Sequence, residues 1–251
     1  MARQTGIIKL KGTIGGISFY KTSDGHLARE KGGVDASRIA NDPAFQRTRE
    51  NGSEFGRAGK GGKLLRVALR TLLQKASDNR VTSRLTKNVL TVIKADTTND
   101  RGLRTIPDGD LSLLENFEFN KNGKLGGLLF AAYAGTIDRV AGTVVADIAE
   151  FIAVNDIVAP SGTTHFMISN GGVEVDFSAE TYVFDSEVSS VLPWDSSTVA
   201  PLSLTANLTA NSTLPIFQVI GIEFFQEVNG QMYSLKNGNY NALAIVGIDT
   251  P

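Results

Sequence analysis

The chain has 251 residues, of which 41% are hydrophobic and 20% charged, a composition that excludes a wholly disordered chain and allows one or two domains. The net charge of −1 conceals two halves, because residues 1–107 hold 21 Lys and Arg against 9 Asp and Glu, whereas residues 108–251 hold 4 against 17. The absence of cysteine excludes disulfides and thiolate metal sites, and with only His26 and His165 present we expect neither a zinc site nor catalysis relayed by histidine.

Residues 1–34 are predicted to form β structure. Residues 7–11 have the pattern of a short strand, and residues 17–20 and 26–29 are expected to be extended on either side of the turn signal Ser23-Asp24-Gly25. A β-hairpin alone is only marginally stable in water. This one is therefore expected to pack on something else.

Residues 35–96 are predicted to be helical. Asp42 followed by Pro43 is typical of a helix start, and a first helix is expected over residues 44–55. The basic, glycine-rich residues 57–63 are interpreted as a flexible joint. Beyond this joint, apolar residues at helical spacing predict two amphipathic helices, separated at Asp78-Asn79 and paired as an α-helical hairpin.

From about residue 110 the apolar residues alternate, which indicates strands. Asn122-Gly123 and Asn229-Gly230 are strong signals for two-residue hairpin turns. Gly171-Gly172 is expected to separate two short strands, at residues 164–168 and 173–177.

Together these patterns predict an α+β chain that is mainly β. An N-terminal β-hairpin and an α-helical hairpin are followed by an antiparallel β-sandwich. The change in charge and in periodicity places the domain boundary between a basic assembly region, residues 1–107, and an acidic β-sandwich domain, residues 108–251.

The sequence carries none of the common catalytic motifs. Leu64 stands where a phosphate-binding loop needs Ser or Thr after Gly62-Lys63. The carboxylate pairs Glu174/Asp176 and Asp185/Glu187 suit a cation or a glycosidase, but acidic alternation on a solvent face is the commoner arrangement. We therefore expect a protein that is not an enzyme and uses no cofactor or metal.

The location of the protein is predicted from what the sequence lacks. It contains no apolar run long enough to span a membrane. Its first residues have no apolar centre of the kind found in secretory signals. We expect a cytoplasmic protein, with release only as part of a larger particle.

Five segments carry a resemblance to a known group. Residues 12–20, with the sequence Gly-Thr-Ile-Gly-Gly-Ile-Ser-Phe-Tyr, are followed by Ala28-Arg29 and by residues 41–49, which begin Asn-Asp-Pro-Ala-Phe-Gln-Arg. This order resembles a family of uncharacterised bacterial proteins, some of which are similar to phage-associated or tube-like structural proteins. Residues 162–166 and 226–230 also resemble that group. The resemblance implies a structural role and carries no catalytic residue.

The opposite charges of the two halves predict self-association. We expect a structural subunit that forms a homopolymeric filament, tube or shell through head-to-tail contacts, in which charge sets orientation and apolar burial supplies most of the affinity. Residues 7–10 are expected to add as a strand to a neighbour. The expected contact residues are Arg3, Ile7, Lys9, Leu10, Lys11, Arg29 and Arg47 on the basic side and Glu174, Asp176, Glu180 and Glu187 on the acidic side.

Two other functions remain open. The helical residues Lys60, Lys63, Arg66 and Arg70 recur every three to four positions, which suits sequence-independent binding or packaging of nucleic acid. A weaker alternative is a carbohydrate-binding sandwich that uses Trp194, although a lone Trp is more often a packing anchor.

Overall fold

The computed structural model describes residues 2–30 and 32–251. Strands account for 36% of the residues and helices for 26%, and the paired strands are antiparallel, which confirms a mixed and mainly β chain. The chain divides into two units, residues 1–50 and 51–251. The predicted boundary at residue 107 falls inside the second unit, because the helices after residue 50 share a hydrophobic core with the strands.

The first unit contains a small four-stranded sheet in the order β1-β4-β3-β2. Its strands are β1 (Ala2–Arg3), β2 (Gly12–Ile14), β3 (Ile17–Thr22) and β4 (Gly25–Glu30). A short helix α1 (Ala36–Asn41) and a 3-10 turn η1 (Pro43–Phe45) follow. Asp42 caps that turn as predicted, since its carboxylate accepts a hydrogen bond from Ala44 N at 2.9 Å.

The strand predicted at residues 7–11 is wrong. Residues 5–11 form a loop whose base is closed by one side chain, because Gln4 Oε1 accepts from Leu10 N at 2.8 Å and Gln4 Nε2 donates to Leu10 O at 3.2 Å. The amide of Gln4 thus satisfies the backbone groups of Leu10 that a neighbouring strand would otherwise pair. The loop presents Ile7 and Ile8 to solvent at its tip.

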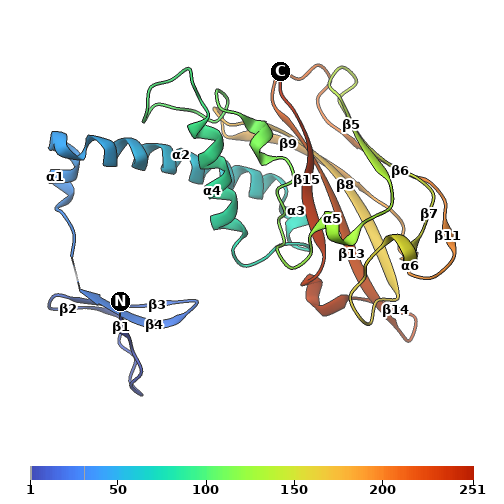
Figure 1. Ribbon diagram of the computed structural model, residues 1–251, viewed down its shortest axis with the longest axis horizontal. Helices are drawn as coiled ribbons and strands as arrows, with labels where there is room; N and C mark the ends of the chain where they lie inside the picture. The colour runs from blue at the N-terminus through green and yellow to red at the C-terminus, as the bar shows by residue number, and fades with distance from the viewer. Residues whose placement is uncertain (1, 31) are drawn as a thin grey trace. The chain divides into compact units, whose positions relative to one another are not determined.

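The flexible joint predicted at residues 57–63 is also wrong. Helix α2 runs without interruption over Gln46–Ala68 (Figure 1). A Cβ on Gly61 would lie 2.2 Å from Ile106 Cδ1, and one on Gly62 would lie 3.5 Å from Thr86 Oγ1. Gly61 therefore permits an approach to Ile106 that a Cβ would block, whereas the distance at Gly62 is an ordinary contact. The burial gained along this face of the helix offsets the low helix propensity of the glycines.

The remaining long helix follows a break where the sequence predicts one. Helix α3 (Arg70–Leu73) ends before Asp78-Asn79, and helix α4 spans Val81–Lys94. The apolar stripe of α4 is fully buried. It packs with the inner face of α2 into one core, which also takes in Val173, Phe217, Val219 and Ile245 from the strands.

Six strands make up the large sheet of the second unit. β8 (His165–Asp176) and β13 (Ile216–Val228) form its centre; β9 (Thr181–Val188) and β10 (Leu192–Pro193) pair with β8, while β14 (Gln231–Ser234) and β15 (Ala242–Asp249) pair with β13. Short helical turns of four residues each lie between strands or before them: η2 (Leu111–Leu114), α5 (Leu125–Leu128), α6 (Ala153–Asp156) and η3 (Leu235–Gly238).

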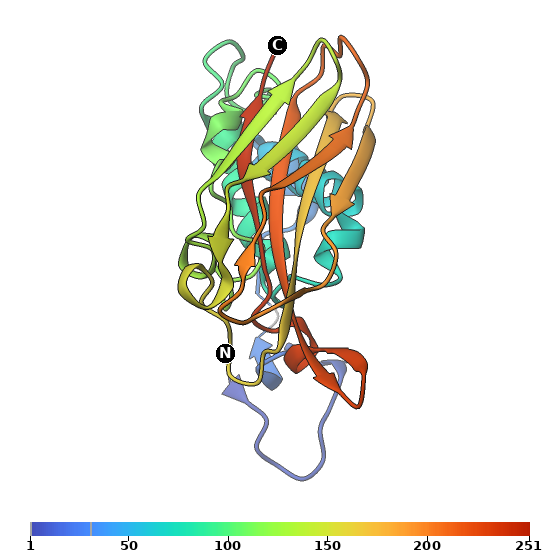
Figure 2. The same ribbon diagram turned by 90° about the vertical axis from the view of Figure 1, so that its right-hand side faces the viewer.

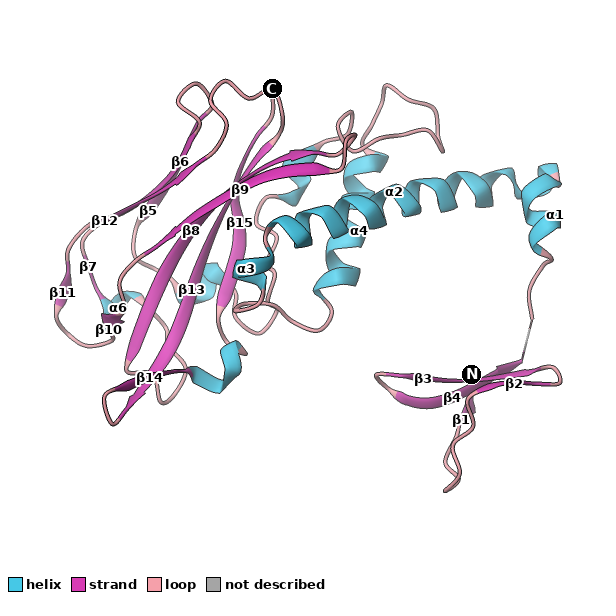
Figure 3. Ribbon diagram, turned by 180° about the vertical axis from the view of Figure 1, so that it is seen from behind, coloured by secondary structure: helices cyan, strands magenta, loops and turns pink. Residues whose placement is uncertain are grey.

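A second, smaller sheet has the order β12-β6-β5, formed by β12 (Leu202–Asn207), β6 (Thr143–Ile148) and β5 (Tyr133–Asp138). Beside it lies a two-stranded pair, β7 (Phe151–Ile152) with β11 (Thr198–Val199). Figure 3 shows how strands dominate this part of the chain.

The second unit is built in layers around the large sheet, which curls into a half-barrel. Figure 2 shows the small sheet on one side of it and the helices on the other. Alternation along β13 produces this arrangement, because Phe217 and Val219 join the core under the helices, whereas Ile220 and Ile222 join the core under the small sheet. Both faces of the central strands are therefore buried.

Two glycine signals were misread. Gly171-Gly172 does not separate two strands, since β8 continues through both residues. A Cβ on Gly171 would lie 2.9 Å from Leu72 Cδ1 on the helix side, and one on Gly172 would lie 2.9 Å from Val144 Cγ2 on the other side. Asn122-Gly123 forms no hairpin, and Gly123 instead allows contact with Tyr240 O. Asn229-Gly230 does connect β13 and β14, as predicted.

Candidate interaction surfaces

The first unit has an unusual surface for a folded segment. None of its described residues, 2–30 and 32–50, is buried. Ile7 is 102% exposed and Ile8 is 81% exposed, and Ile14 and Ile17 are exposed on the sheet. A sheet without a buried face lacks the hydrophobic term that normally stabilises such structures.

The predicted basic contact residues are spread over this unit. Arg3 donates to Asp24 O at 3.0 Å, Lys9 donates to Gln4 O at 2.6 Å, and the Arg29 guanidinium lies 5.6 Å from the ring centre of Tyr20. Lys11 is exposed, and Arg47 forms an ion pair with Glu50 at 2.8 Å. Lys9 and Lys11 both follow Ile7 and Ile8 in the same loop.

One predicted acidic contact residue is misplaced. Glu174 is only 5% exposed. Residues of the small sheet and of the segment after it, such as Val144 and Leu208, pack over this face of β8. Alternation predicts that Glu174 and Asp176 share a solvent face, but the small sheet covers the first of them, which removes Glu174 from any surface contact.

The other acidic residues remain accessible and have local partners. Asp176 accepts from Ser178 N at 2.8 Å and from Ala179 N at 2.9 Å, which organises the turn between β8 and β9. Glu180, in the same turn, forms an ion pair with Lys60 at 3.2 Å. Such exposed pairs contribute about 0 to 1 kcal/mol.

The carboxylate pair Asp185/Glu187 has a structural role. Glu187 Oε2 accepts from Thr205 N at 2.5 Å, and Asp185 Oδ2 accepts from Asn207 N at 2.7 Å. Both N–H groups belong to β12, the edge of the small sheet. The two side chains thus satisfy backbone donors that would otherwise be unpaired, and they tie the edges of the two sheets together.

The basic stripe predicted on the helices is only partly formed. Lys63 and Arg70 are exposed and Lys60 pairs with Glu180. Arg66 is half-buried, and Arg70 lies on α3 beyond the end of α2. The four predicted side chains thus differ in exposure and in partners, and they belong to two helices.

Two adjoining hollows lie beside the turn after β8. The larger has a volume of about 400 Å³ and the smaller about 240 Å³, and both are lined by Pro107, Phe177 and Ser178. The larger one, here called the acidic groove, also has apolar walls, among them Leu214 and Ile248. Among the described residues that line it, the charged side chains are Asp110 and Asp176. Sequence reasoning missed this groove because its walls come from distant segments.

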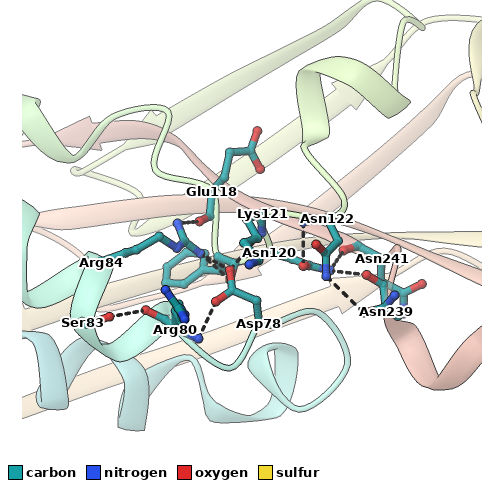
Figure 4. Close-up of polar contacts among 11 residues, drawn as sticks. Asp78, Arg80, Ser83, Arg84, Glu118, Asn120, Lys121, Asn122, Asn239 and Asn241 are labelled. Atoms are coloured by element: carbon teal, nitrogen blue, oxygen red, sulfur yellow. Dashed lines mark hydrogen bonds and ion pairs between the residues drawn. The ribbon is translucent and has the colours of Figure 1, made fainter. Parts of the chain in front are cut away.

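A buried polar cluster connects the break before α4 with the segment ahead of α5 (Figure 4). Arg84 donates to Asp78 Oδ2 at 2.5 Å and to the carbonyls of Glu118 and Phe119 at 2.6 and 3.0 Å. Burial would raise the pKa of Asp78, but the N–H donors and the guanidinium beside its carboxylate hold that pKa below its usual range.

The same cluster extends through a set of asparagines. Asn120 Nδ2 donates to Asn239 O at 3.0 Å and to Asn241 O at 2.7 Å, and Asn241 Nδ2 donates to Lys75 O at 3.0 Å. These bonds join segments that are far apart in sequence. Because Arg84, Asn120 and Asn241 donate to backbone carbonyls of distant segments (Figure 4), we assign the cluster a role in stabilising the fold.

Trp194 and His165, whose side chains could in principle bind a ligand, are both held by contacts within the fold. Trp194 is half-buried against the core under the small sheet, and its Nε1 donates to Ile157 O at 3.2 Å. His165 lies on β8, half-buried, with Nδ1 2.9 Å from Thr164 Oγ1. Within the described part of the chain, no group of three or more His, Cys, Asp or Glu side chains is placed to hold a metal ion.

Comparison with protein-family models, with curated proteins and with solved structures gave no match. In residues 2–30 and 32–251, no helix is long and apolar enough to cross a membrane.

Proposed function

We propose that this protein is a structural subunit that assembles with copies of itself into a filament, tube or shell. In this proposal residues 1–50 act as a basic arm, and the acidic, sandwich-like β region of a second copy receives it. The observation that supports it most is the arm itself, which has four paired strands and no buried residue among those described.

Such an arm needs a surface to pack on. Removing apolar area from water is worth about 25 cal/mol per Å², and the exposed isoleucines of the arm forgo that gain when it is alone. A contact between two different surfaces of identical chains is heterologous, and it generates rings or open filaments rather than closed dimers. Assembly therefore supplies the burial that the arm lacks.

Charge supports the direction of the contact. Residues 1–50 contain nine Lys and Arg against five Asp and Glu, whereas residues 108–251 are strongly acidic. Arg3, Lys9, Lys11 and Arg29 on the arm would approach Asp176, Glu180 and Glu187 of the next copy. Opposite charges steer encounter and fix orientation, while apolar contacts supply most of the affinity.

Sedimentation velocity of the full chain tests the proposal. We expect the average particle mass to rise with protein concentration and to fall as salt is raised, because exposed charges are screened. Lys9→Glu with Lys11→Glu should weaken assembly, whereas Lys94→Glu with Lys121→Glu, which changes the net charge equally in the second unit, should not. A single particle at every concentration and ionic strength would refute the proposal.

A second function, sequence-independent nucleic-acid binding, is favoured only by the exposure of Lys63 and Arg70. It predicts tight binding of random duplex DNA with a steep loss of affinity at higher salt. Gel-shift titration of the wild type and of Lys63→Glu with Arg70→Glu separates it from self-assembly, because that pair of changes would abolish DNA binding and leave particle mass unchanged.

A further inference from the structure

We infer that the acidic groove is the docking site for residues 5–11 of a second copy, with Ile7 and Ile8 entering it and Lys9 and Lys11 lying against its acidic rim. This inference rests on the proposed self-assembly and specifies the two surfaces that meet. The occupant is a hydrophobic and basic loop, and the receptor is an apolar hollow with acidic side chains.

The loop has the geometry of an inserting element. It is the part of residues 2–50 with the most exposed large apolar side chains, Ile7 at 102% and Ile8 at 81%. Its base is held by the paired hydrogen bonds between Gln4 and Leu10 and by the bond from Lys9 Nζ to Gln4 O. A loop closed before binding loses less conformational entropy when it docks.

The acidic groove complements this loop in size and in apolar character. Its volume of about 400 Å³ lies within the range of ordinary ligand sites, about 300 to 1,000 Å³, and accommodates aliphatic side chains. Leu214 and Ile248 offer apolar walls. The apolar character of both partners supplies the burial that the arm lacks.

Charge distinguishes this groove from the neighbouring hollow. The described charged side chains on the acidic groove are Asp110 and Asp176, whereas those on the smaller hollow are Arg57, Lys60 and Glu180. Because Lys60 pairs with Glu180, the smaller hollow keeps the excess positive charge of Arg57. Lys9 and Lys11 would therefore be attracted to the acidic groove and disfavoured at the smaller hollow. Repulsion between like charges disfavours docking of the loop in the smaller hollow, so the loop should select the acidic groove.

The absence of cysteine from the chain allows a direct test with introduced thiols. Protein carrying Ile8→Cys is mixed with protein carrying Thr213→Cys, on the exposed rim of the groove, under mild oxidation with oxidised glutathione. Since a disulfide requires Cα atoms within about 7 Å, we expect a cross-linked dimer to form at least about tenfold faster than with Ser196→Cys, an exposed position outside the groove. Equal rates would overturn the inference.

Sedimentation of uncross-linked variants gives an independent readout. Ile7→Ser with Ile8→Ser, and separately Thr213→Arg, should each raise the concentration needed for half-assembly about tenfold or more, a factor within the burial energy of two isoleucines. The matched controls Val34→Ser and Ser196→Arg should leave it unchanged. All five substituted positions are exposed, so the fold is expected to persist, and circular dichroism checks this.

The outcomes separate this inference from the proposed function. One outcome is that the wild type assembles, Thr213→Arg assembles at the same concentration, and Ile8→Cys cross-links to Thr213→Cys no faster than to Ser196→Cys. In that case self-assembly stands and the acidic groove is not the docking site. If the double variant Ile8→Cys with Thr213→Cys cross-links within single chains at every dilution, docking occurs in the same copy and the inference is overturned. If the wild type never assembles, both proposals fail.

Discussion

At the scale of single residues, the carboxylate of Asp78 shows how distant segments are joined. It accepts hydrogen bonds from Arg80 N, from Lys121 N and from the Arg84 guanidinium, at 2.6, 3.0 and 2.5 Å. The side chain of Asp78 is almost fully buried, while that of Arg84 is partly exposed. Removing the carboxylate would leave two N–H groups without this acceptor, and it would take the opposite charge away from the guanidinium, which would keep its bonds to the carbonyls of Glu118 and Phe119.

We therefore expect Asp78→Ala to lower the free energy of unfolding by about 2 to 4 kcal/mol, near the lower end of the range for breaking a buried ion pair because Arg84 keeps some contact with water. Urea denaturation measures this change. Asp147→Ala, at an exposed position of β6, should stay within about 0.5 kcal/mol of the wild type. A change at Asp78 no larger than that at Asp147 would contradict the assigned role.

Asp96 should make stability depend on acid. Burial would raise its pKa, but Asn99 Nδ2 and the backbone N–H groups of Thr105, Asn99 and Thr98 hold the pKa well below its usual range. A carboxyl with a depressed folded pKa stabilises the fold above its unfolded pKa, about 3.9. That contribution is lost as pH falls through the folded pKa.

The expected result is a wild-type urea midpoint that falls between pH 5 and pH 2.5, with a smaller fall for Asp96→Asn. Asp108→Asn serves as a neighbouring control, because Asp108 accepts from Asn99 and Thr105 but is exposed. If Asp96→Asn and the wild type lose stability in parallel over this range, the four donors do not control the titration.

The sequence predicts residue roles only where the partner is close along the chain. The cap by Asp42 was predicted because its acceptor and donor are two positions apart. Arg84 contacts carbonyls 34 and 35 positions away, and nothing in the local pattern indicates them. The burial of Glu174 was missed for the same reason, since the segments that cover it are distant in sequence.

At the scale of elements, the glycines of α2 and β8 decide how closely layers approach. Gly61 faces Ile106 where a Cβ would lie 2.2 Å from Cδ1, whereas Gly56, in the same helix, has no atom within 4 Å of such a Cβ. Both glycines lower intrinsic helix stability by a similar amount. Their substitutions therefore separate helix propensity from packing.

Gly56→Ala should raise the free energy of unfolding by about 0.5 to 1 kcal/mol, because it reduces the entropy of the unfolded chain and meets open space. Gly61→Ala should lower it by about 1 to 2 kcal/mol, since Ile106 must shift in a packed core. Thermal and urea midpoints check both. Stabilisation by both alanines would show that α2 does not pack closely at Gly61.

The spacing of apolar residues predicted that most helices and strands exist, but it was less successful in predicting where they begin and end. The stripe of α4 and the turn at Asn229-Gly230 were predicted because the pattern is local. Glycine was read as a break at residues 57–63 and at Gly171-Gly172, yet both α2 and β8 pass through. A glycine that ends an element and one that makes room for a neighbour are identical in sequence, and only the packing distinguishes them.

At the scale of the whole molecule, the two units differ in what stabilises them. The second unit has three hydrophobic clusters, and the first has paired strands with no buried side chain among its described residues. Charge counted along the sequence suggested a division at residue 107, whereas the structure divides into compact units after residue 50. Residues 51–107 are basic but pack within the second unit, so charge alone is a poor guide to domain limits.

This difference predicts unequal protection from hydrogen exchange. In dilute protein, amides of β3 and β4 should exchange nearly as fast as in an unfolded chain, while those of β8 and β13 should exchange only through global unfolding. At concentrations where the chain assembles, protection should appear in residues 1–50, because docking supplies the missing buried surface. Strand β14, which is also exposed but belongs to the second unit, is the internal control and should keep the same protection at both concentrations. Strong protection of β3 and β4 in the dilute sample would mean that the arm is stable alone and that burial does not drive its association.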